Sequence, residues 1–424
     1  MDELLIIGAG PAGLSLAHDY GPGARILERS DEVGGLCRSI EFGGGVFDIG
    51  GHSFHSPHPE VLDRVEGLMR GRWFRQRRDA RVFFQGGLIA YPFQNHVDQI
   101  VDPAVAAECR RGRPNPGAST SADNFEDWIV QRFGAGIARH FMLPYNRKLW
   151  GANLRRMSCD WVAQRIAGAG AEPDADAAPM RRPLMPDSEV AYPAEGGFGE
   201  IYRAFARRCG PIEFGQDVRC IDIEARTAQT AGGEVWSWRK LVSTMPLPAL
   251  LGAIVDCPRD LVAAADRLEQ VSLKVLLIAI GEPLTDQPQR IYIADDAAPP
   301  HKVAFNHTSS PSLRRRPVHG VMCEIAYSPE KSLAGDRELE QATLAWLVRA
   351  GLVSSSAAVI ETRWVEVAYG YPVYTHERPA IVERIRAWLE PRGIHTIGRF
   401  GAWEYVNSDA CIWQGMALAE RLKS

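Results

Sequence analysis

Two histidines lie close together in the segment DIGGHSFHSP, directly after a pair of glycines. An imidazole titrates near neutral pH, so His52 and His55 could set the charge and protonation of a group bound beside them. Gly50 and Gly51 would let the backbone pass close to such a group. A single histidine in a loop is an ordinary residue, so this hypothesis depends on the elements that position the pair.

The start of the chain predicts a dinucleotide-binding turn. Residues 3–7 form an apolar strand pattern, GxGxxG follows at 8–13, and a helix is predicted over 11–20. A second strand, 24–27, ends at Glu28, whose carboxylate can accept the hydroxyls of a ribose. The glycines permit a tight turn and the approach of a pyrophosphate, which the helix N-terminus attracts. The residues expected at the dinucleotide are Gly8, Gly10, Pro11, Ala12, Gly13, Glu28 and Arg29.

Composition limits the partners that this chain can have. With 424 residues and 46% hydrophobic side chains, it is long enough for two domains. A net charge of −4 and the lack of a long apolar run predict neither a nucleic-acid partner nor a membrane span. Asp2 and Glu3 do not fit a secretory signal, so we expect a cytoplasmic protein. Eight scattered cysteines without a CxxC pair argue against a metal site.

Two motifs resemble a large flavoprotein superfamily, which includes amine oxidases, protoporphyrinogen oxidases and UDP-galactopyranose mutases. ERSDEVGGLCRS resembles the segment that extends FAD binding along the diphosphate, and IHTIGRFGAWEYVNSD near the C-terminus resembles the closing FAD motif. The resemblance implies FAD as the cofactor and an α/β fold. It also implies contacts with FAD at Gly35, Leu36, Arg38, Gly50, Gly51, His52, Val218, Gly398, Arg399, Tyr405 and Asn407.

The resemblance also implies an interleaved domain organisation. A Rossmann-like FAD-binding domain of the GR2 type would comprise residues 1–55, 200–250 and 390–424. A mixed α+β substrate-binding domain with a helical part would comprise residues 56–199 and 251–389.

Within this superfamily, the histidine segment is similar to the GPHIFHT-type segment of UDP-galactopyranose mutases. This resemblance implies that His52 and His55 tune or orient the flavin, and that a tyrosine pair with an arginine holds the diphosphate of a substrate. The catalytic residues that it implies are His52, His55, Tyr371, Arg399 and Tyr405. The substrate-lining residues that it implies are Tyr91, Phe93, Phe141, Tyr145, Trp150, Arg165, Lys302 and Tyr371.

The chain departs from the mutase pattern at several cationic positions. Arg165 matches the first arginine of an Arg-x3-Arg pair, but Ala169 stands at the second position. Lys302 is the nearest counterpart of another family arginine, and lysine does not reproduce a forked guanidinium contact. Asn407 replaces an aspartate. These departures leave the usual UDP-galactose substrate open, whereas the flavin motifs are intact.

The leading hypothesis is an FAD-dependent flavoenzyme that acts on a sugar or nucleotide-sugar through N5 of reduced flavin, without net redox change. It would need an electron source, either a flavin reductase or NAD(P)H. The alternative is a net oxidoreductase of the amine oxidase or protoporphyrinogen oxidase type. A third hypothesis is a binding protein of the same architecture without flavin. The sequence leaves open the substrate, the direction of reaction, the oligomeric state, and whether the Ala/Pro-rich loop 167–189 forms a lid; a similar loop is expected at 110–123.

Overall fold

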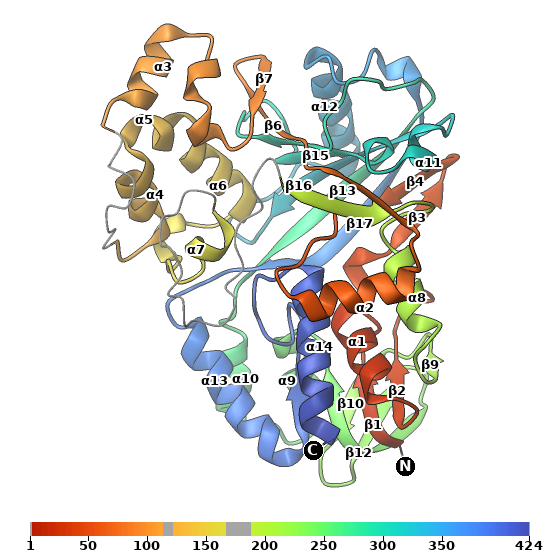
Figure 1. Ribbon diagram of the computed structural model, residues 1–424. Coiled ribbons are helices and arrows are strands. Elements are labelled where there is room, and N and C mark those ends of the chain that lie inside the picture. Colours follow the sequence, from red (N-terminus) through yellow and green to blue (C-terminus); the bar gives the residue numbers. More distant parts are fainter. Residues whose placement is uncertain (1, 113–121, 167–187, 424) are drawn as a thin grey trace.

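Two large β-sheets form the centre of the molecule, one below the other in Figure 1. The computed structural model describes residues 2–112, 122–166 and 188–423. Most of the two predicted loops, 110–123 and 167–189, lies outside the described residues, and so does the predicted lid. None of the described helices is both long enough and apolar enough to cross a membrane.

The lower sheet contains the predicted dinucleotide-binding strands. Its parallel part has the order β18-β12-β1-β2-β9, and a hairpin of β10 and β11 joins the edge of β12. The central strand β1 is an apolar run that is buried on both faces, as expected for a parallel sheet. The strands are β1 (Asp2–Ile7), β2 (Ala24–Leu27), β9 (Ile212–Glu213), β10 (Val218–Asp222), β11 (Thr227–Thr230), β12 (Val235–Ser243) and β18 (Ile394–Thr396).

Helices cover both faces of this sheet. On one face, α1 packs against the C-terminal helix α14, and a Cβ atom on Gly415 would lie 2.6 Å from the carbonyl oxygen of Ala12. The predicted helix over 11–20 is confirmed by α1. On the other face, apolar side chains of α9, α10 and α13 share a core with β1 and β12. The helices are α1 (Pro11–Tyr20), α2 (Pro59–Met69), α8 (Glu200–Ala206), α9 (Leu247–Ala253), α10 (Arg259–Ala265), α13 (Arg378–Leu389) and α14 (Ser408–Lys423).

The upper sheet is mostly antiparallel, with the order β17-β13-β16-β15-β14-β6-β7. Its register places three residues side by side, because Tyr292 pairs with Lys302 and Lys302 pairs with Glu324. The strands are β6 (Ala80–Phe84), β7 (Gly87–Ala90), β13 (Gln270–Ile280), β14 (Arg290–Ile293), β15 (Lys302–Phe305), β16 (His319–Tyr327) and β17 (Val359–Pro372). Helices α11 (Pro311–Arg314) and α12 (Asp336–Arg349) lie beside this sheet (Figure 1).

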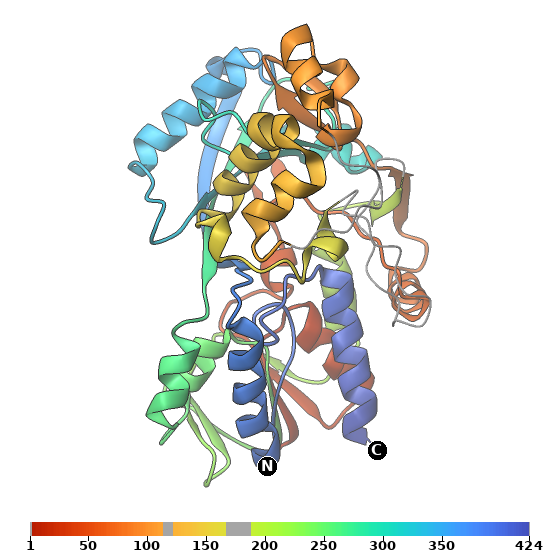
Figure 2. The ribbon, with the colours of Figure 1, turned by 90° about the vertical axis from the view of Figure 1, so that its left-hand side faces the viewer.

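A small helical part completes the upper half. Figure 2 shows it in front of the upper sheet and above α13 and α14. It consists of α3 (Pro103–Arg110), α4 (Phe125–Phe133), α5 (Ala135–Ile137), a π-helical turn (Ala138–Met142), α6 (Leu143–Trp150) and α7 (Val162–Arg165).

Two short ribbons link the halves: β3 (Ser39–Phe42) with β4 (Gly45–Asp48), and β5 (Trp73–Arg77) with β8 (Glu189–Pro193). At their junction the buried Asp48 carboxylate accepts hydrogen bonds from Ser39 Oγ at 2.6 Å, Tyr192 Oη at 2.7 Å and the Phe198 amide at 3.0 Å. Burial raises the pKa of Asp48 to about 6, although these hydrogen bonds favour the charged form.

The two sheets and the helices around them confirm the predicted α/β fold class. The predicted domain boundaries stay a prediction.

Candidate active site

The turn between β1 and α1 has the shape that its glycines predict. Gly8 has a φ of +102°, which an L side chain rarely adopts, and a Cβ atom on Gly13 would lie 2.0 Å from the Gly8 carbonyl oxygen. At Gly10 a Cβ atom would meet no protein atom within 4 Å. Gly8 and Gly13 are thus required by the fold, while Gly10 leaves open space at the helix N-terminus. This geometry fits the diphosphate of a dinucleotide.

Glu28 lies at the end of β2, where the sequence predicts an acceptor for ribose hydroxyls. Its buried carboxylate accepts the Ala9 amide at 2.7 Å through Oε2, and the amide and hydroxyl of Ser30 at 2.9 and 2.8 Å through Oε1. These bonds fix the carboxylate beside the glycine turn. The neighbouring Arg29 is exposed.

A cavity of about 320 Å³ is lined by residues of the upper sheet, the helical part and the loop before α14. Its walls bring together residues that are far apart in the sequence, including both histidines that first suggested a site. The predicted site residues that line it are Leu36, Gly50, Gly51, His52, His55, Tyr91, Phe141, Tyr145, Trp150, Arg165, Lys302, Tyr371, Arg399, Tyr405 and Asn407.

Two tyrosines and a tryptophan form the aromatic centre of this cavity. The rings of Tyr371 and Tyr405 meet edge to face with 5.3 Å between centroids. Trp150 packs edge to face on both, at 6.2 and 5.5 Å. These geometries are favourable for aromatic pairs, so the two phenols are held in fixed positions.

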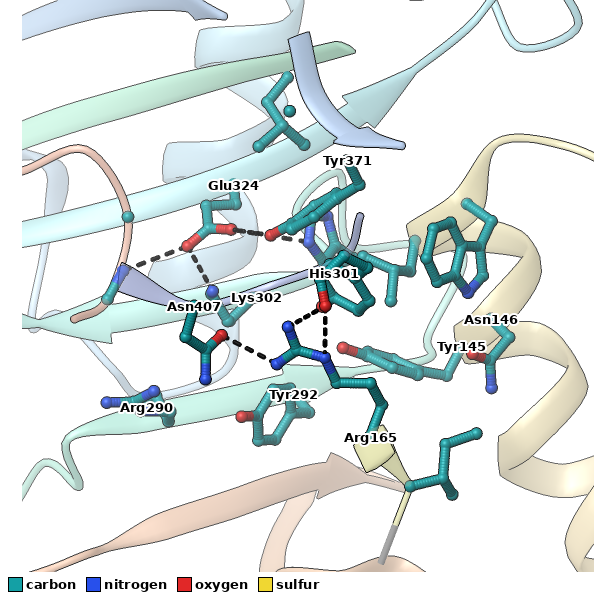
Figure 3. Close-up of a pocket in the computed structure, with 18 of the residues that line it drawn as sticks. Tyr145, Asn146, Arg165, Arg290, Tyr292, His301, Lys302, Glu324, Tyr371 and Asn407 are labelled. Atoms are coloured by element: carbon teal, nitrogen blue, oxygen red, sulfur yellow. Dashed lines mark hydrogen bonds and ion pairs between the residues drawn. The ribbon is translucent and has the colours of Figure 1, made fainter. Parts of the chain in front are cut away.

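Two guanidinium groups flank the tyrosine pair. Arg165 lies 4.2 Å from the centre of the Tyr405 ring, donates from Nε to the Tyr405 carbonyl at 2.9 Å, and donates to Asn407 Oδ1 at 2.9 Å (Figure 3). Arg399 lies 5.7 Å from the ring centre of Tyr371 and donates to the carbonyls of Gly370 and Val406. The carbonyl acceptors of Arg399 orient its guanidinium without neutralising its charge, so this side of the cavity suits an anion.

A row of stacked aromatic rings leads from the core to the cavity. Phe93 stacks on Phe141 at 4.7 Å, and Phe141 stacks on Tyr145 at 5.4 Å. Tyr145 and Phe141 line the cavity, but Phe93 is fully buried behind them and does not. The expectation that Phe93 contacts substrate is therefore corrected: its ring supports Phe141 from the core side.

Both histidines line the cavity, but the pKa of each lies below the near-neutral value that the sequence suggested. His52 stacks on Phe198, with 4.9 Å between ring centres. Burial, with the nearby charges of Lys302, Arg290 and Arg399, lowers its pKa to about 3. Burial also lowers the pKa of His55, against the opposing effect of Asp409. A lone histidine titrates near neutrality, but here the surroundings keep His52 uncharged at neutral pH.

Glu324 on β16 was not predicted from the sequence, yet it connects several parts of the site. Its buried carboxylate accepts Lys302 Nζ at 2.7 Å, Tyr371 Oη at 3.2 Å and the Gly51 amide at 3.2 Å (Figure 3). A Cβ atom on Gly50 would lie 2.4 Å from Oε1 of the same carboxylate. Lys302 is thus present where expected, but Glu324 neutralises it.

Other cavity residues missed at the sequence level come from the same sheet and from the loop before β6. They include Arg78, Arg290, Tyr292 and His301, which directly precedes β15. A signal was present in the strand RIYI, because an arginine and a tyrosine at alternate positions share one face of a strand.

The remaining predicted positions lie outside the cavity. Arg38 Nη1 donates to the Gly35 carbonyl at 2.9 Å, and Gly398 has a φ of +86° beside Ala12. Val218 begins β10 and is buried in the lower core. Cofactor contacts at these positions stay a prediction.

A glycine turn open at a helix N-terminus and an acid after β2 fit a nucleotide cofactor, and a polar cavity between the upper sheet, the helical part and the loop before α14 fits a small-molecule substrate. The sequence profile described as "Flavin containing amine oxidoreductase" matches residues 12–421. The chain therefore belongs to the flavin-containing amine oxidoreductase family and is a flavin-dependent enzyme.

Individual relatives agree with this assignment. The crystal structure of a reduced UDP-galactopyranose mutase superposes with a TM-score of 0.88 at 26% identity, covering 100% of this chain and 96% of that chain. A dTDP-fucopyranose mutase from Escherichia coli is 26% identical over 161 residues, which is 36% of this chain and 42% of the mutase. The chain therefore aligns with less than half of that curated relative.

More distant structures share the fold alone. A fatty acid isomerase from P. acnes gives a TM-score of 0.67 at 15% identity, covering 99% of this chain and 98% of that one. A double mutant of putrescine oxidase gives 0.69 at 16% identity, with the same coverage. The mutase-like resemblance within this superfamily is thus confirmed by the structure of higher similarity.

Proposed function

We propose that the flavin is FAD and that the enzyme is a redox-neutral mutase, which interconverts ring forms of a sugar linked to a nucleoside diphosphate. The observation that carries this proposal is the tyrosine pair Tyr371 and Tyr405 with Arg165 and Arg399 beside it, in one cavity. Two buried phosphate charges need cationic and hydroxyl partners. The two guanidinium groups supply the first and the Tyr405 hydroxyl the second, whereas the Tyr371 hydroxyl already donates to Glu324.

The remaining walls fit the other parts of such a substrate. Tyr145 and Phe141 offer stacked aromatic rings for a nucleobase. Trp150 packs on both tyrosines and would limit the position of the sugar. A substrate held at both ends is fixed relative to the cofactor, and this positioning is a large part of what a protein contributes to a cofactor-dependent reaction.

FAD would be held by residues of the lower half and by the histidine loop. The open space at Gly10 would admit its diphosphate, Glu28 its ribose, and the loop of Gly50 and Gly51 its ring system. When bound and reduced, FAD supplies a nucleophilic nitrogen, N5, for the anomeric carbon of the sugar. Because His52 is uncharged near neutral pH, it would offer the ring a neutral hydrogen-bonding partner.

Two comparisons support a mutase more than an oxidase. The structure of highest similarity reported above is a UDP-galactopyranose mutase, and the curated relative is a dTDP-fucopyranose mutase. Both names describe mutases of sugars linked to nucleoside diphosphates. The superposable putrescine oxidase is only 16% identical and supports the fold alone.

The proposal is tested with the purified, flavin-loaded enzyme under anaerobic conditions. Dithionite-reduced enzyme is incubated with UDP-linked and dTDP-linked hexoses, and the products are separated by chromatography. A mutase forms an isomer of unchanged mass only after reduction of the flavin. Turnover of the oxidised enzyme with oxygen as the only acceptor, and no isomer after reduction, would establish an oxidoreductase instead.

The proposal also includes a cytoplasmic location for the enzyme. A flavin reductase or NAD(P)H would supply the electrons that reduce its flavin.

A further inference from the structure

A second cationic group lies in the cavity, on elements different from those that carry Arg165 and Arg399. Arg78 donates from Nη2 to the Tyr292 hydroxyl at 3.0 Å, and its guanidinium lies 4.7 Å from the centre of the Tyr91 ring. Arg290 stands two residues before Tyr292 on β14, and both side chains reach the cavity. The register brings the arginines together, because Arg290 pairs with Ala80, two residues after Arg78.

Both arginines of this group are buried: Arg78 is 7% exposed and Arg290 is 9% exposed. Arg290 donates from Nη2 to Ser53 Oγ at 3.0 Å, but its Nε has no partner among the described residues. No carboxylate of these residues lies within ion-pair distance of Arg290. A buried guanidinium with an unused donor is costly unless a ligand supplies the acceptor.

The charges of this group act on one another. Burial lowers the pKa of Arg290, and the charge of Arg78 lowers it further. Burial would raise the pKa of Tyr292, but Arg78, Arg290 and Lys302 lower it below the ordinary value. A phenol becomes more acidic only in a strongly positive surrounding, so the group attracts a negative charge.

The position of this group within the cavity differs from that of the tyrosine pair. Arg165 and Arg399 are held by carbonyls of the loop before α14 and of β17. Arg290 instead donates to Ser53, directly after His52, and so lies beside the histidine loop (Figure 3 shows it near Tyr292). Under the proposed function this loop adjoins the flavin, where the sugar must stand for its anomeric carbon to react.

We propose that Arg78, Arg290 and Tyr292 form a subsite for a carboxylate on the sugar, and that the preferred substrate is an acidic, uronic-type nucleotide sugar. This inference rests on the proposed function and names its substrate class. A carboxylate has two acceptor oxygens and matches the forked donors of arginine, whereas a primary hydroxyl has no charge to offer. Lys302 does not serve this subsite, because Glu324 already neutralises it.

The test compares two sugars that differ at a single carbon. UDP-galacturonate and UDP-galactose, their dTDP analogues, and UDP and dTDP alone are titrated into the reduced holoenzyme by calorimetry. We expect the acidic sugar to bind at least about tenfold more tightly than the neutral one. In Arg290→Gln that ratio should fall to about one, while the affinity for UDP or dTDP should stay within about threefold.

Two further variants keep the test informative if Arg290→Gln folds poorly. Tyr292→Phe keeps the ring and removes the hydroxyl between the arginines, so it should reduce the preference for the acid. Arg219→Gln, an exposed arginine that pairs with Asp217, is the matched control and should change nothing.

The outcomes separate the two proposals. Equal affinity for the acidic and neutral sugars would overturn the carboxylate subsite and leave the mutase proposal intact. A loss of UDP or dTDP affinity in Arg290→Gln as large as the loss for the acidic sugar would assign these arginines to the diphosphate, and would also overturn the subsite. Failure of every nucleotide and nucleotide sugar to bind would overturn the proposed function itself.

Discussion

The hydroxyl of Tyr371 donates a hydrogen bond to Glu324 Oε2 across 3.2 Å, joining the end of β17 to the centre of β16 beneath the cavity. The other oxygen of the same carboxylate accepts Lys302 Nζ and the Gly51 amide. One buried carboxylate thus positions a candidate substrate tyrosine, a cation and the loop expected next to the flavin. Because these contacts share a single acceptor group, a change in one should affect the others.

Removal of the Tyr371 hydroxyl tests this connection. In Tyr371→Phe the buried carboxylate loses one donor, so we expect the free energy of unfolding to fall by about 1–2 kcal/mol in urea titrations. Tyr369→Phe is the control on the same strand, because Tyr369 packs on Phe400 and Trp403 and its hydroxyl has no partner among the described residues. It should stay within about 0.5 kcal/mol of the parent protein. Equal effects of the two variants would show that the hydrogen bond contributes nothing.

Two glycine substitutions separate cofactor binding from folding. Gly10→Ala adds a Cβ atom where no protein atom lies within 4 Å, and its φ of −75° suits alanine. We expect normal stability but a loss of flavin affinity of about tenfold or more, because the methyl group occupies the path of the diphosphate. Flavin absorbance after gel filtration measures the loss.

Gly415→Ala is the opposite case. Its Cβ atom would lie 2.6 Å from the Ala12 carbonyl oxygen, at the packing of α14 on α1. We expect the free energy of unfolding to fall by about 1–3 kcal/mol, as for other overpacked contacts.

For the first substitution, flavin retention by Gly10→Ala at the level of the parent protein would contradict the proposed position of the diphosphate.

Replacement of Arg165 tests whether the planar guanidinium group beside the tyrosine pair contributes to substrate binding. Arg165→Lys keeps the charge but replaces the planar fork of donors with a single ammonium group, so we expect KM for a nucleotide sugar to rise by about tenfold or more. The control is Arg155→Lys, because Arg155 pairs with Glu126 on the surface. An unchanged KM in Arg165→Lys would remove Arg165 from the substrate site.

The raised pKa of Asp48 predicts that the free energy of unfolding depends on pH. Its pKa rises from 3.8 to about 6 on folding, because of burial, so the folded protein holds the proton more tightly than the unfolded chain. This contribution to stability is fully present below about pH 4 and is lost as the pH rises through about 6. The parent protein should therefore lose about 2 kcal/mol relative to Asp48→Asn between pH 4 and pH 7.

Urea unfolding of the parent protein and Asp48→Asn at several pH values measures this difference, with other titrating groups cancelling between them. A difference that is constant with pH, or that grows in favour of the parent protein as the pH rises, would contradict the raised pKa.

The sequence alone was sufficient for the glycine turn with its flanking strands and helix, and for part of the cavity. The glycine turn, the helix Pro11–Tyr20 and the acid Glu28 depend on residues that are close in sequence, so their pattern predicts their geometry. The resemblance to mutases also identified Arg165, Tyr371 and Tyr405, which do lie together.

Burial changed what other residues could be expected to do. Phe93 has the residue type of a ligand wall, but it stands behind Phe141 in the core. His52 has the residue type of a group that titrates near neutrality, but burial and three nearby cations keep it uncharged there. Neither property can be read from the local pattern, because each depends on neighbours that come from other parts of the chain.

The sequence by itself determined the flavoprotein motifs and the shape of the glycine turn, because contiguous residues fix backbone geometry. Only the tertiary structure decided the chemistry of the cavity wall. Tyr292, Lys302 and Glu324 lie in one row because three strands pair in a single register, and Arg78 meets Arg290 because β6 pairs with β14. A shift of one residue in either pairing would turn these side chains to the opposite face of the sheet, so the site depends on strand register.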